Sequence, residues 1–375
     1  MPAPAALATA ARALRAFDPS RLEVLVGLDG FVDLILEVVD KRSDATHYTR
    51  VETIEQLGQR ILRASGLSSN LELVARQQKL GGNGPIMANA MLEAGFAVTY
   101  VGNIGRPSIH PVFADMARRC KAVYSLAEPG HTDALEFRDG KLMLGKHESL
   151  KEVTYDRLLE VMGLERLRQA WSSSRLIALT NWTMLTYQTD TWKRLHRDMA
   201  GVAAPKGAIL FIDLADPEKR PAEEIADAAR FLKNFRSSHR VVLGLNQKES
   251  IEVSSAIGLR FNPEEIESNA ATLRKSLELD MVVVHPTRRA ACATEKGSAS
   301  IDGPFCASPK LTTGAGDNFN AGFCVGLLAG LEPQECLAAG VANSGFYVRN
   351  ARSATARDLA GFLDAWSQRH GDPSF

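Results

Sequence analysis

Short, continuous apolar runs alternate with longer amphipathic segments along most of the chain. The compact runs occupy residues 22–28, 97–102, 176–179, 208–213, 241–245 and 281–284. Apolar runs of this length without polar alternation are typical of strands that are buried on both faces. Because amphipathic helices separate them, the pattern predicts repeated strand–helix units. We therefore expect an α/β protein with a mostly parallel central sheet covered on both sides.

The segments between these strands carry apolar residues at helical spacing. Helices are predicted at residues 1–17, 54–64, 69–77, 86–94, 112–120, 158–170, 192–200, 222–235, 264–277, 335–350 and 356–366. The sequence contains no internal repeat, low-complexity tract or Pro/Ser-rich linker. Residues 1–375 are therefore expected to form a single domain.

Two predicted hairpins interrupt the strand–helix alternation. Residues 135–138 and 141–144 alternate in polarity around Asp139-Gly140, a dipeptide that favours tight hairpin turns. Residues 34–39 are also compatible with a strand that leaves the main body. We expect these segments to form a separate small sheet, such as a lid. The second hairpin is predicted over residues 290–301.

Composition excludes several classes of partner and location. Lys+Arg and Asp+Glu both number 44, so the formal net charge is zero and no nucleic-acid footprint is expected. The five cysteines are scattered and form no C-x-x-C pair, as in proteins of reducing compartments. Arg12 and Arg15 follow the N-terminal apolar run, whereas a signal peptide has its charges before it. Without a run of about 18 apolar residues no membrane span is expected, and the prediction is a cytoplasmic protein.

The candidate chemistry centres on residues 312–317, Thr-Thr-Gly-Ala-Gly-Asp. Gly314 and Gly316 lack a Cβ, and with Ala315 they open a helix whose unpaired N–H groups favour an anion. Asp317 adds a carboxylate beside that anion site. A phosphate cradle with an adjacent base is what the transfer of a phosphoryl group to a hydroxyl requires. The structural alternative is a glycine-rich turn that Asp317 caps before a buried helix.

Other polar residues follow the predicted strands at the edge where open α/β sheets bind ligands. Asp29 and Asp33 follow the first strand and could accept hydrogen bonds from substrate hydroxyls, or could lie in a turn and a solvated loop. The cluster Gly81, Gly82 and Asn83 precedes a predicted helix. Its glycines allow close approach of a ligand, although an ordinary loop would look the same.

Asn246 and Glu249 directly follow the strand predicted at 241–245. An amide and a carboxylate at this place could hold a hydrated Mg²⁺ or order phosphate oxygens. The same spacing also matches a capping box, in which Asn246 caps the helix and Glu249 bonds back to the backbone. The spacing favours the capping box, and both roles can hold together.

Taken in order, these clusters resemble the motifs of the ribokinase or PfkB family of carbohydrate and nucleoside kinases. Residues 312–317 match the family's C-terminal signature nearly residue for residue, and residues 246–249 match its Asn-x-x-Glu motif. Gly81-Gly82 stands in the place of the family's substrate loop, and Asp33 in that of its substrate aspartate. The resemblance covers about residues 22–365.

The resemblance implies a ribokinase-like three-layer α/β/α fold and an ATP-dependent kinase that uses Mg²⁺ and acts on a sugar-like acceptor. Asp317 would be the base that takes the proton from the acceptor hydroxyl. The backbone N–H groups of Gly314, Ala315 and Gly316 would form the anion hole for the γ-phosphoryl group of ATP. Asp33 would hold the sugar hydroxyls, with the nearby Asp29, Gly81, Gly82 and Asn83.

The resemblance also assigns the donor side and the lid. Asn246 and Glu249 would organise Mg²⁺ through water, and Thr313 would lie at the nucleotide. Asn343 belongs to the stretch 342–344, Ala-Asn-Ser, which resembles the segment that helps to enclose the adenine. Residues of about 34–52 and 123–150 would form the β lid. The lids of this family sometimes pair between subunits, which allows a homodimer through the lid.

Three departures from the family pattern bear on these expectations. Leu311 stands where the family usually has an Asp beside a monovalent-cation site, which puts activation by such a cation in doubt. Ile86 stands where the substrate loop usually brings an Asn; Asn83 or Asn89 could take that place, or the acceptor could be an unusual one. Residues 285–289, His-Pro-Thr-Arg-Arg, replace a Gly-containing turn, and their arginines either contact donor phosphates or are solvated.

The acceptor stays open among sugars, sugar phosphates and nucleosides. A nucleoside kinase of the same fold is therefore one alternative, and a catalytically weak sugar- or nucleotide-binding regulator is another. A dinucleotide-binding oxidoreductase does not fit, because Phe319 stands where the third glycine of G-x-G-x-x-G is required. The sequence predicts a carbohydrate kinase.

Overall fold

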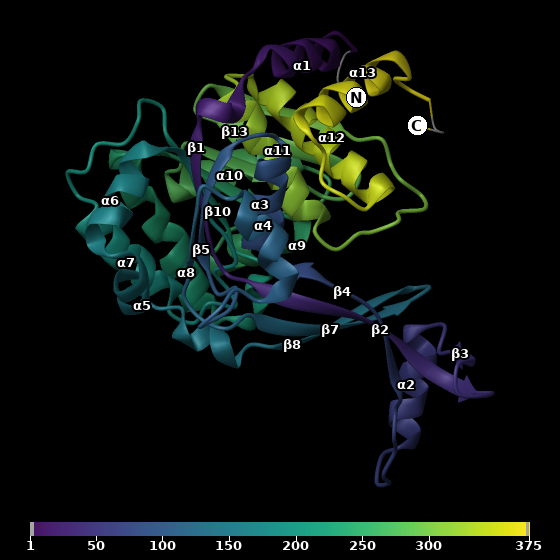
Figure 1. Cartoon of the computed structure of the whole chain (residues 1–375). Helices are drawn as coiled ribbons and strands as arrows, with labels where there is room; N and C mark the ends of the chain where they lie inside the picture. The colour runs from purple at the N-terminus through teal and green to yellow at the C-terminus, as the bar shows by residue number, and fades with distance from the viewer. Residues whose placement is uncertain (1–3, 373–374) are drawn as a thin grey trace.

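Successive residues in the strands of the larger sheet belong to two different hydrophobic cores. In β9 (Ser174–Leu179), Leu176 and Ala178 lie in one core, whereas Ile177 and Leu179 lie in the other. Because successive side chains of a strand point to opposite faces, both faces of this sheet are covered. The computed structural model describes residues 4–372 and 375, and it places helices on both sides of the sheet (Figure 1). The predicted three-layer α/β/α fold with a mostly parallel central sheet is confirmed.

Within the described residues, the larger sheet has nine strands in the order β14-β13-β12-β11-β10-β9-β1-β5-β6. The strands from β12 to β6 pair in parallel, and the hairpin β13–β14 is antiparallel. Besides β9, the strands are β1 Glu23–Leu28, β5 Ala97–Gly102, β6 Ala122–Ser125, β10 Ile209–Asp213, β11 Arg240–Leu245, β12 Met281–Val284, β13 Arg289–Thr294 and β14 Gly297–Asp302.

The helices divide between the two faces of the larger sheet. One face is covered by α1 Pro4–Ala16, α3 Asn83–Glu93, α4 Ala114–Arg119, α11 Ala315–Leu328, α12 Pro333–Asn350 and α13 Ala356–Gln368. The other face is covered by α5 Tyr155–Met162, α6 Leu164–Ser173, α7 Gln188–Asp198, α8 Ala222–Phe231, α9 Gln247–Ala256 and α10 Ile266–Leu277. The first and last helices, α1 and α13, lie side by side (Figure 1).

A second sheet leaves the body along the long strand β2, which spans Phe31–Arg42. It contains β2 with β3 Tyr48–Arg50, β4 Leu73–Gly81, β7 Gly130–Phe137 and β8 Gly140–Lys146. The sheet projects from the body, and α2 (Ile54–Arg63) and β3 lie at its far end (Figure 1). We call this sheet together with α2 the arm. The arm has a small core of its own, formed by Leu36, Val38, Val51, Leu57, Leu135 and Phe137.

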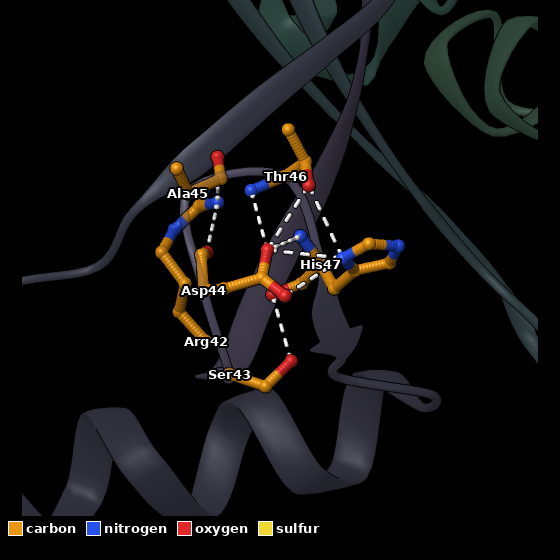
Figure 2. Close-up of polar contacts among 6 residues, drawn as sticks. All are labelled: Arg42, Ser43, Asp44, Ala45, Thr46 and His47. Atoms are coloured by element: carbon orange, nitrogen blue, oxygen red, sulfur yellow. Dashed lines mark hydrogen bonds and ion pairs between the residues drawn. The ribbon is translucent and has the colours of Figure 1, made fainter.

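The turn between β2 and β3 is organised by one carboxylate (Figure 2). The Asp44 side chain accepts hydrogen bonds of 2.8 Å from the backbone N–H groups of both Thr46 and His47. His47 Nδ1 lies a further 2.8 Å from the same carboxylate. These hydrogen bonds hold the pKa of Asp44 at about 2 and close the turn locally.

Several sequence-based expectations need correction. The helix predicted at 69–77 is wrong, because β4 there pairs with β2, and this pairing outweighs the helical preference of its Arg and Gln residues. The helix predicted at 158–170 is broken at Gly163, which has a φ of 77°. The whole of β6, Ala122–Ser125, pairs with β5 in the larger sheet, so the range 123–150 given for the lid begins within the main body. Residues 1–3 of the predicted N-terminal helix lie outside the described residues.

None of the helices in residues 4–372 combines the length and the apolar character that crossing a bilayer would require.

Candidate active site

The start of α11 is shaped by Gly314, its N-cap residue. Gly314 has a φ of 94°, in the left-handed region that favours glycine. A Cβ at this position would also lie 2.9 Å from Tyr347 Oη and 3.1 Å from side-chain carbons of Ile86. The N–H of Ala315 donates a 3.1 Å hydrogen bond within the turn, and Gly316 follows in the first turn of the helix. Glycine is thus required at position 314, and a helix start of this kind suits an anion.

Asp317 lies in this first turn and is 7% exposed. Its Oδ1 accepts a 2.9 Å hydrogen bond from Asn83 Nδ2. Burial raises the pKa of Asp317 to about 8; the Asn83 hydrogen bond opposes this rise, and the charges of Asp29, Glu249 and Asp33 add to it. The structure therefore brings five of the predicted site residues into one electrostatic neighbourhood.

Asp29 anchors the start of α3 from the end of β1. Its carboxylate accepts hydrogen bonds from Asn83 N at 2.9 Å, Gly84 N at 2.7 Å and Asn181 Nδ2 at 2.8 Å. Gly82, the N-cap of α3, has no side chain that could do this. Burial raises the pKa of Asp29 to about 6, and the three hydrogen bonds moderate that rise. Asp29 therefore fixes the position of Asn83, and both of its oxygens are occupied by donors of the protein.

Asp33 lies on β2 opposite Lys79 of β4 and Thr132 of β7. It is 3% exposed, and burial raises its pKa, while the charges of Lys79 and Lys141 and a hydrogen bond from Thr132 lower it. A Cβ on Gly81 would lie 2.3 Å from Asp33 Cγ, so the absent side chain makes room for this carboxylate. The second glycine cluster therefore shapes two acidic positions, since Gly82 borders Asp29 and Gly81 borders Asp33.

Asn246 and Glu249 form the predicted capping box at the start of α9. Glu249 N donates to Asn246 Oδ1 at 3.0 Å, and Asn246 N donates to Glu249 Oε2 at 2.8 Å. Glu249 Oε1 also accepts a 3.1 Å hydrogen bond from Asp216 N. The capping box is confirmed, and Glu249 is at the same time part of the cavity wall.

A carboxylate that the sequence reasoning missed, Asp213, lies at the end of β10 beside Glu249. Asp213 Oδ2 accepts a 2.7 Å hydrogen bond from Asn320 Nδ2, whereas its buried Oδ1 has no partner among the described residues. Burial raises the pKa of both Asp213 and Glu249. The charge of Asp317 raises the pKa of Asp213 further, and the charge of Asp213 raises that of Glu249. The signal was available, because Asp213 ends a predicted strand at the edge where ligands bind.

A cavity of about 500 Å³, a size typical of ligand sites, opens beside these groups. Its wall includes Asn83, Asp213, Asn246, Glu249, His285, Arg288, Arg289, Phe305, Thr312, Ala315, Gly316, Asp317, Phe319, Ser344 and Arg349. His285 stacks on Phe319 with ring centroids 4.5 Å apart, and the guanidinium of Arg288 lies 3.8 Å from the Phe305 ring centroid. The cavity thus joins the acidic groups and the helix start to an aromatic, arginine-bearing end.

Asn343 and Thr313, which are predicted to lie at the nucleotide, both form hydrogen bonds with other residues of the protein. Asn343 is buried, and its Nδ2 donates a 2.6 Å hydrogen bond to Asn318 O, which ties α12 to α11. The carbonyl oxygen of Thr313 accepts a 2.7 Å hydrogen bond from Tyr347 Oη. The side chain of Thr313 accepts a hydrogen bond from Lys141 of the arm.

A second group of carboxylates near α9 is paired with a lysine side chain. Asp216, Glu218 and Glu252 place oxygen atoms close together. The ammonium group of Lys248 lies 2.6 Å from Asp216 and 2.7 Å from Glu218. This more exposed cluster is therefore neutralised by a lysine, in contrast to the pair Asp213 and Glu249.

Comparison with known proteins agrees with this geometry. The sequence model of the prokaryotic ketohexokinase family matches residues 4–366. A ketohexokinase from Haloferax volcanii is 28% identical over 353 residues, which cover 93% of this chain and 93% of that protein.

Solved structures show the same fold at lower identity. A carbohydrate kinase from Agrobacterium tumefaciens has a TM-score of 0.62 at 18% identity and covers 91% of this chain and 97% of its own. Phosphofructokinase-2 from Escherichia coli has a TM-score of 0.64 at 14% identity, with 93% and 100% covered. A ribokinase from Thermotoga maritima has a TM-score of 0.58 at 17% identity, with 91% and 98% covered.

Proposed function

Because the chain belongs to the prokaryotic ketohexokinase family and is a carbohydrate kinase, we propose that it transfers the γ-phosphoryl group of ATP to a hydroxyl group of a ketohexose. The observation that carries the proposal is the position of Asp317. This buried carboxylate lies in the first turn of α11, beside the cradle at Gly314, and accepts a hydrogen bond from Asn83. The name of the Haloferax volcanii relative supports the choice of acceptor.

In the proposed reaction, Asp317 takes the proton of the acceptor hydroxyl as its oxygen attacks the γ-phosphorus. The new O–P bond forms while the bond from the γ-phosphorus to the ADP oxygen breaks, so that ADP leaves. Phosphoryl transfer depends mainly on positioning and on charge stabilisation. The Asn83 hydrogen bond orients the carboxylate of Asp317, and the helix start at Gly314 and Gly316 faces the charge of the moving group. Only the ionised form of Asp317 can take this proton; its pKa of about 8 makes it a strong base once ionised, and the Asn83 hydrogen bond favours the ionised form.

The donor side suits a divalent cation. Asp213 Oδ1 is buried without a hydrogen-bond partner among the described residues, and the mutual charge of Asp213 and Glu249 is uncompensated. Oxygen ligands of this kind suit Mg²⁺, and Asp213 and Glu249 would hold it through water, with Asn246 beside them. When bound, Mg²⁺ neutralises charge on the phosphates of the donor.

Asp33 is proposed to bind the acceptor. It lies on the arm, close enough to Asp317 for their charges to interact. Its carboxylate would accept hydrogen bonds from the hydroxyl groups of the sugar. Asn83 would lie between the acceptor and the base. Its backbone N–H is held by Asp29, and its side-chain amide donates a hydrogen bond to Asp317.

The arm is proposed to act as a lid and to pair with the arm of a second copy of the chain. Large apolar side chains are exposed on the arm and on the loop between α2 and β4, namely Ile61, Leu62, Leu67, Leu71, Leu73, Met143 and Leu144. Exposed apolar surface of this kind marks interaction sites, and the proposal assigns the pairing to Ile61 and Leu62 on α2. Leu62→Glu, at a side chain 75% exposed, should convert a dimer into a monomer in light scattering, whereas an unchanged mass would contradict pairing through this surface.

The proposed function is tested by ADP release with ATP, Mg²⁺ and a panel of acceptors. The panel contains fructose and tagatose as ketohexoses, with glucose, fructose 6-phosphate and adenosine as the other acceptor classes. The proposal predicts turnover with ketohexoses and at least about tenfold lower kcat/KM, or about 1.4 kcal/mol, for the others. Preference for a nucleoside or a sugar phosphate would contradict the acceptor, and ADP release that ignores every acceptor would contradict the reaction.

A further inference from the structure

One face of the arm carries a row of charged side chains that approach the start of α11. Asp33 of β2 lies opposite Lys79, and Glu136 of β7 lies opposite Lys141 of β8. The charges of Lys79 and Lys141 influence one another, and that of Lys79 also reaches Asp317. Because alternate residues of a strand share a face, this row lies on a single side of the second sheet.

Lys141 makes the contact that joins the arm to the glycine-rich stretch. Its Nζ donates a 3.2 Å hydrogen bond to Thr312 Oγ1 and another hydrogen bond to Thr313 Oγ1. These two threonines immediately precede Gly314, the N-cap of α11. A side chain of the hairpin therefore reaches across more than 170 residues of sequence to the edge of the anion site.

The charge of Lys141 is held there without a direct counter-ion. Both of its hydrogen-bond partners are neutral hydroxyl groups, and no carboxylate of the described residues forms an ion pair with it. Burial and the charge of Lys79 lower the pKa of Lys141. Lys146, on the same strand, is 62% exposed and lies 2.8 Å from Asp133. The charges of Glu136 and Asp33 oppose the lowering of the Lys141 pKa, but neither carboxylate forms an ion pair with Lys141. A phosphoryl group of a ligand would therefore give this half-buried ammonium group the direct anionic partner that it lacks among the described residues.

We infer that Lys141 is a catalytic residue that the arm supplies, and that its ammonium group contacts the γ-phosphoryl group of the bound nucleotide during transfer. The inference rests on the proposed function and extends it to the arm. An ammonium group has three donors, so Lys141 can bond to a phosphoryl oxygen and keep a threonine partner. The proton of the acceptor still goes to Asp317; Lys141 adds positive charge where negative charge is carried by the phosphoryl oxygens. The same contact closes the arm over the site when a nucleotide is present.

The test compares Lys141→Met with the matched control Lys146→Met, at two lysines of the same strand. Loss of one donor to a developing charge typically lowers kcat by about 10²–10³-fold, and we expect a fall of this size for Lys141→Met. The KM for the ketohexose should change less than threefold, because the hydrogen bonds of Lys141 go to the threonines before α11 and not to Asp33, the proposed sugar ligand. Lys146→Met should keep wild-type kcat. Lys141→Arg, which retains a cation, should recover part of the loss.

Nucleotide affinity separates a contact with the γ-phosphoryl group from a merely structural role. Only ATP carries this group, so Lys141→Met should weaken the binding of ATP about tenfold more than that of ADP, which is about 1.4 kcal/mol. Equal weakening of both nucleotides, or a kcat within threefold of wild type, would overturn the inference. If Lys141→Met does not fold, Lys141→Gln and Lys141→Arg are compared in the same ATP/ADP experiment. Wild-type turnover of a ketohexose with no effect of Lys141 would reject the inference alone, whereas no wild-type turnover of any ketohexose would reject the proposed function.

Discussion

Asn83 Nδ2 donates a 2.9 Å hydrogen bond to Asp317 Oδ1, across 234 residues of sequence. The backbone N–H of the same Asn83 is held by Asp29 at 2.9 Å. The two glycine-rich helix starts of the chain, at α3 and α11, are thus joined through one amide side chain. In the proposed mechanism this amide orients the base.

The first prediction concerns Asn83. Asn83→Ala removes the hydrogen bond that lowers the pKa of Asp317, so this pKa should rise above its present value of about 8. The rate profile of kcat/KM should then shift its acidic limb to higher pH, and kcat at neutral pH should fall about tenfold or more. The measurement is the pH dependence of ADP release. Glu93→Gln, at the other end of the same helix, is the control and should leave the profile in place. A profile that also stays in place for Asn83→Ala would exclude the orienting role.

The second prediction concerns stability in the absence of ligands. The pKa of Asp317 is about 8 in the folded protein and about 3.8 as a reference, so the folded state binds this proton more tightly. The resulting stabilisation is fully present below about pH 4 and is lost as the pH rises to about 8. Asp317→Asn removes this titration and keeps an oxygen that can accept from Asn83. The variant should therefore gain thermal stability relative to wild type between pH 5 and pH 8. Thermal melts at both pH values give the answer, and parallel loss of Tm in the two proteins would speak against the raised pKa.

The third prediction separates the two carboxylate groups near α9. Asp213→Asn removes charge from the pair that lacks a counter-ion, so half-maximal activity should require at least about tenfold more Mg²⁺. Glu252→Gln serves as the control, because Lys248 already neutralises its cluster. The measurement is activity against Mg²⁺ concentration at saturating ATP. If Glu252→Gln raised the Mg²⁺ requirement more than Asp213→Asn, the cation would bind at Asp216, Glu218 and Glu252, and the proposed site at Asp213 and Glu249 would be contradicted.

Local patterns were sufficient to predict the elements that depend on neighbouring residues. The buried strands, the Asp139-Gly140 hairpin and the capping box of Asn246 and Glu249 all follow from spacing within a few residues. The helix predicted at residues 69–77 is wrong, because the strand β4 that begins there pairs with β2, which lies more than 30 residues earlier in the sequence. Pairing with a distant strand is not encoded in local periodicity.

Site residues could be predicted where a motif reflects the backbone conformation that a position requires. They could not be predicted where their role depends on contacts between residues far apart in the sequence. Gly314 shows in the sequence because only glycine suits its φ of 94°. The position of Asp29 directly after a strand marks it as a candidate in the sequence. Its role in holding the start of α3 could not be predicted, because it depends on hydrogen bonds from the distant residues Asn83 and Asn181. The approach of Lys141 to Thr313 depends on how the arm folds back on the body, and no spacing within the chain records it.

The most direct measurement of the central claim is single-turnover phosphorylation of a ketohexose by Asp317→Asn, with nucleotide affinity measured in parallel. Loss of a positioned base typically lowers the rate by about 10²–10⁴-fold, and we predict a fall of this size. The variant should still bind ATP with close to wild-type affinity, because it lacks only the carboxylate that receives the proton. Phosphorylation by Asp317→Asn at the wild-type rate would contradict the assignment of Asp317 as the base.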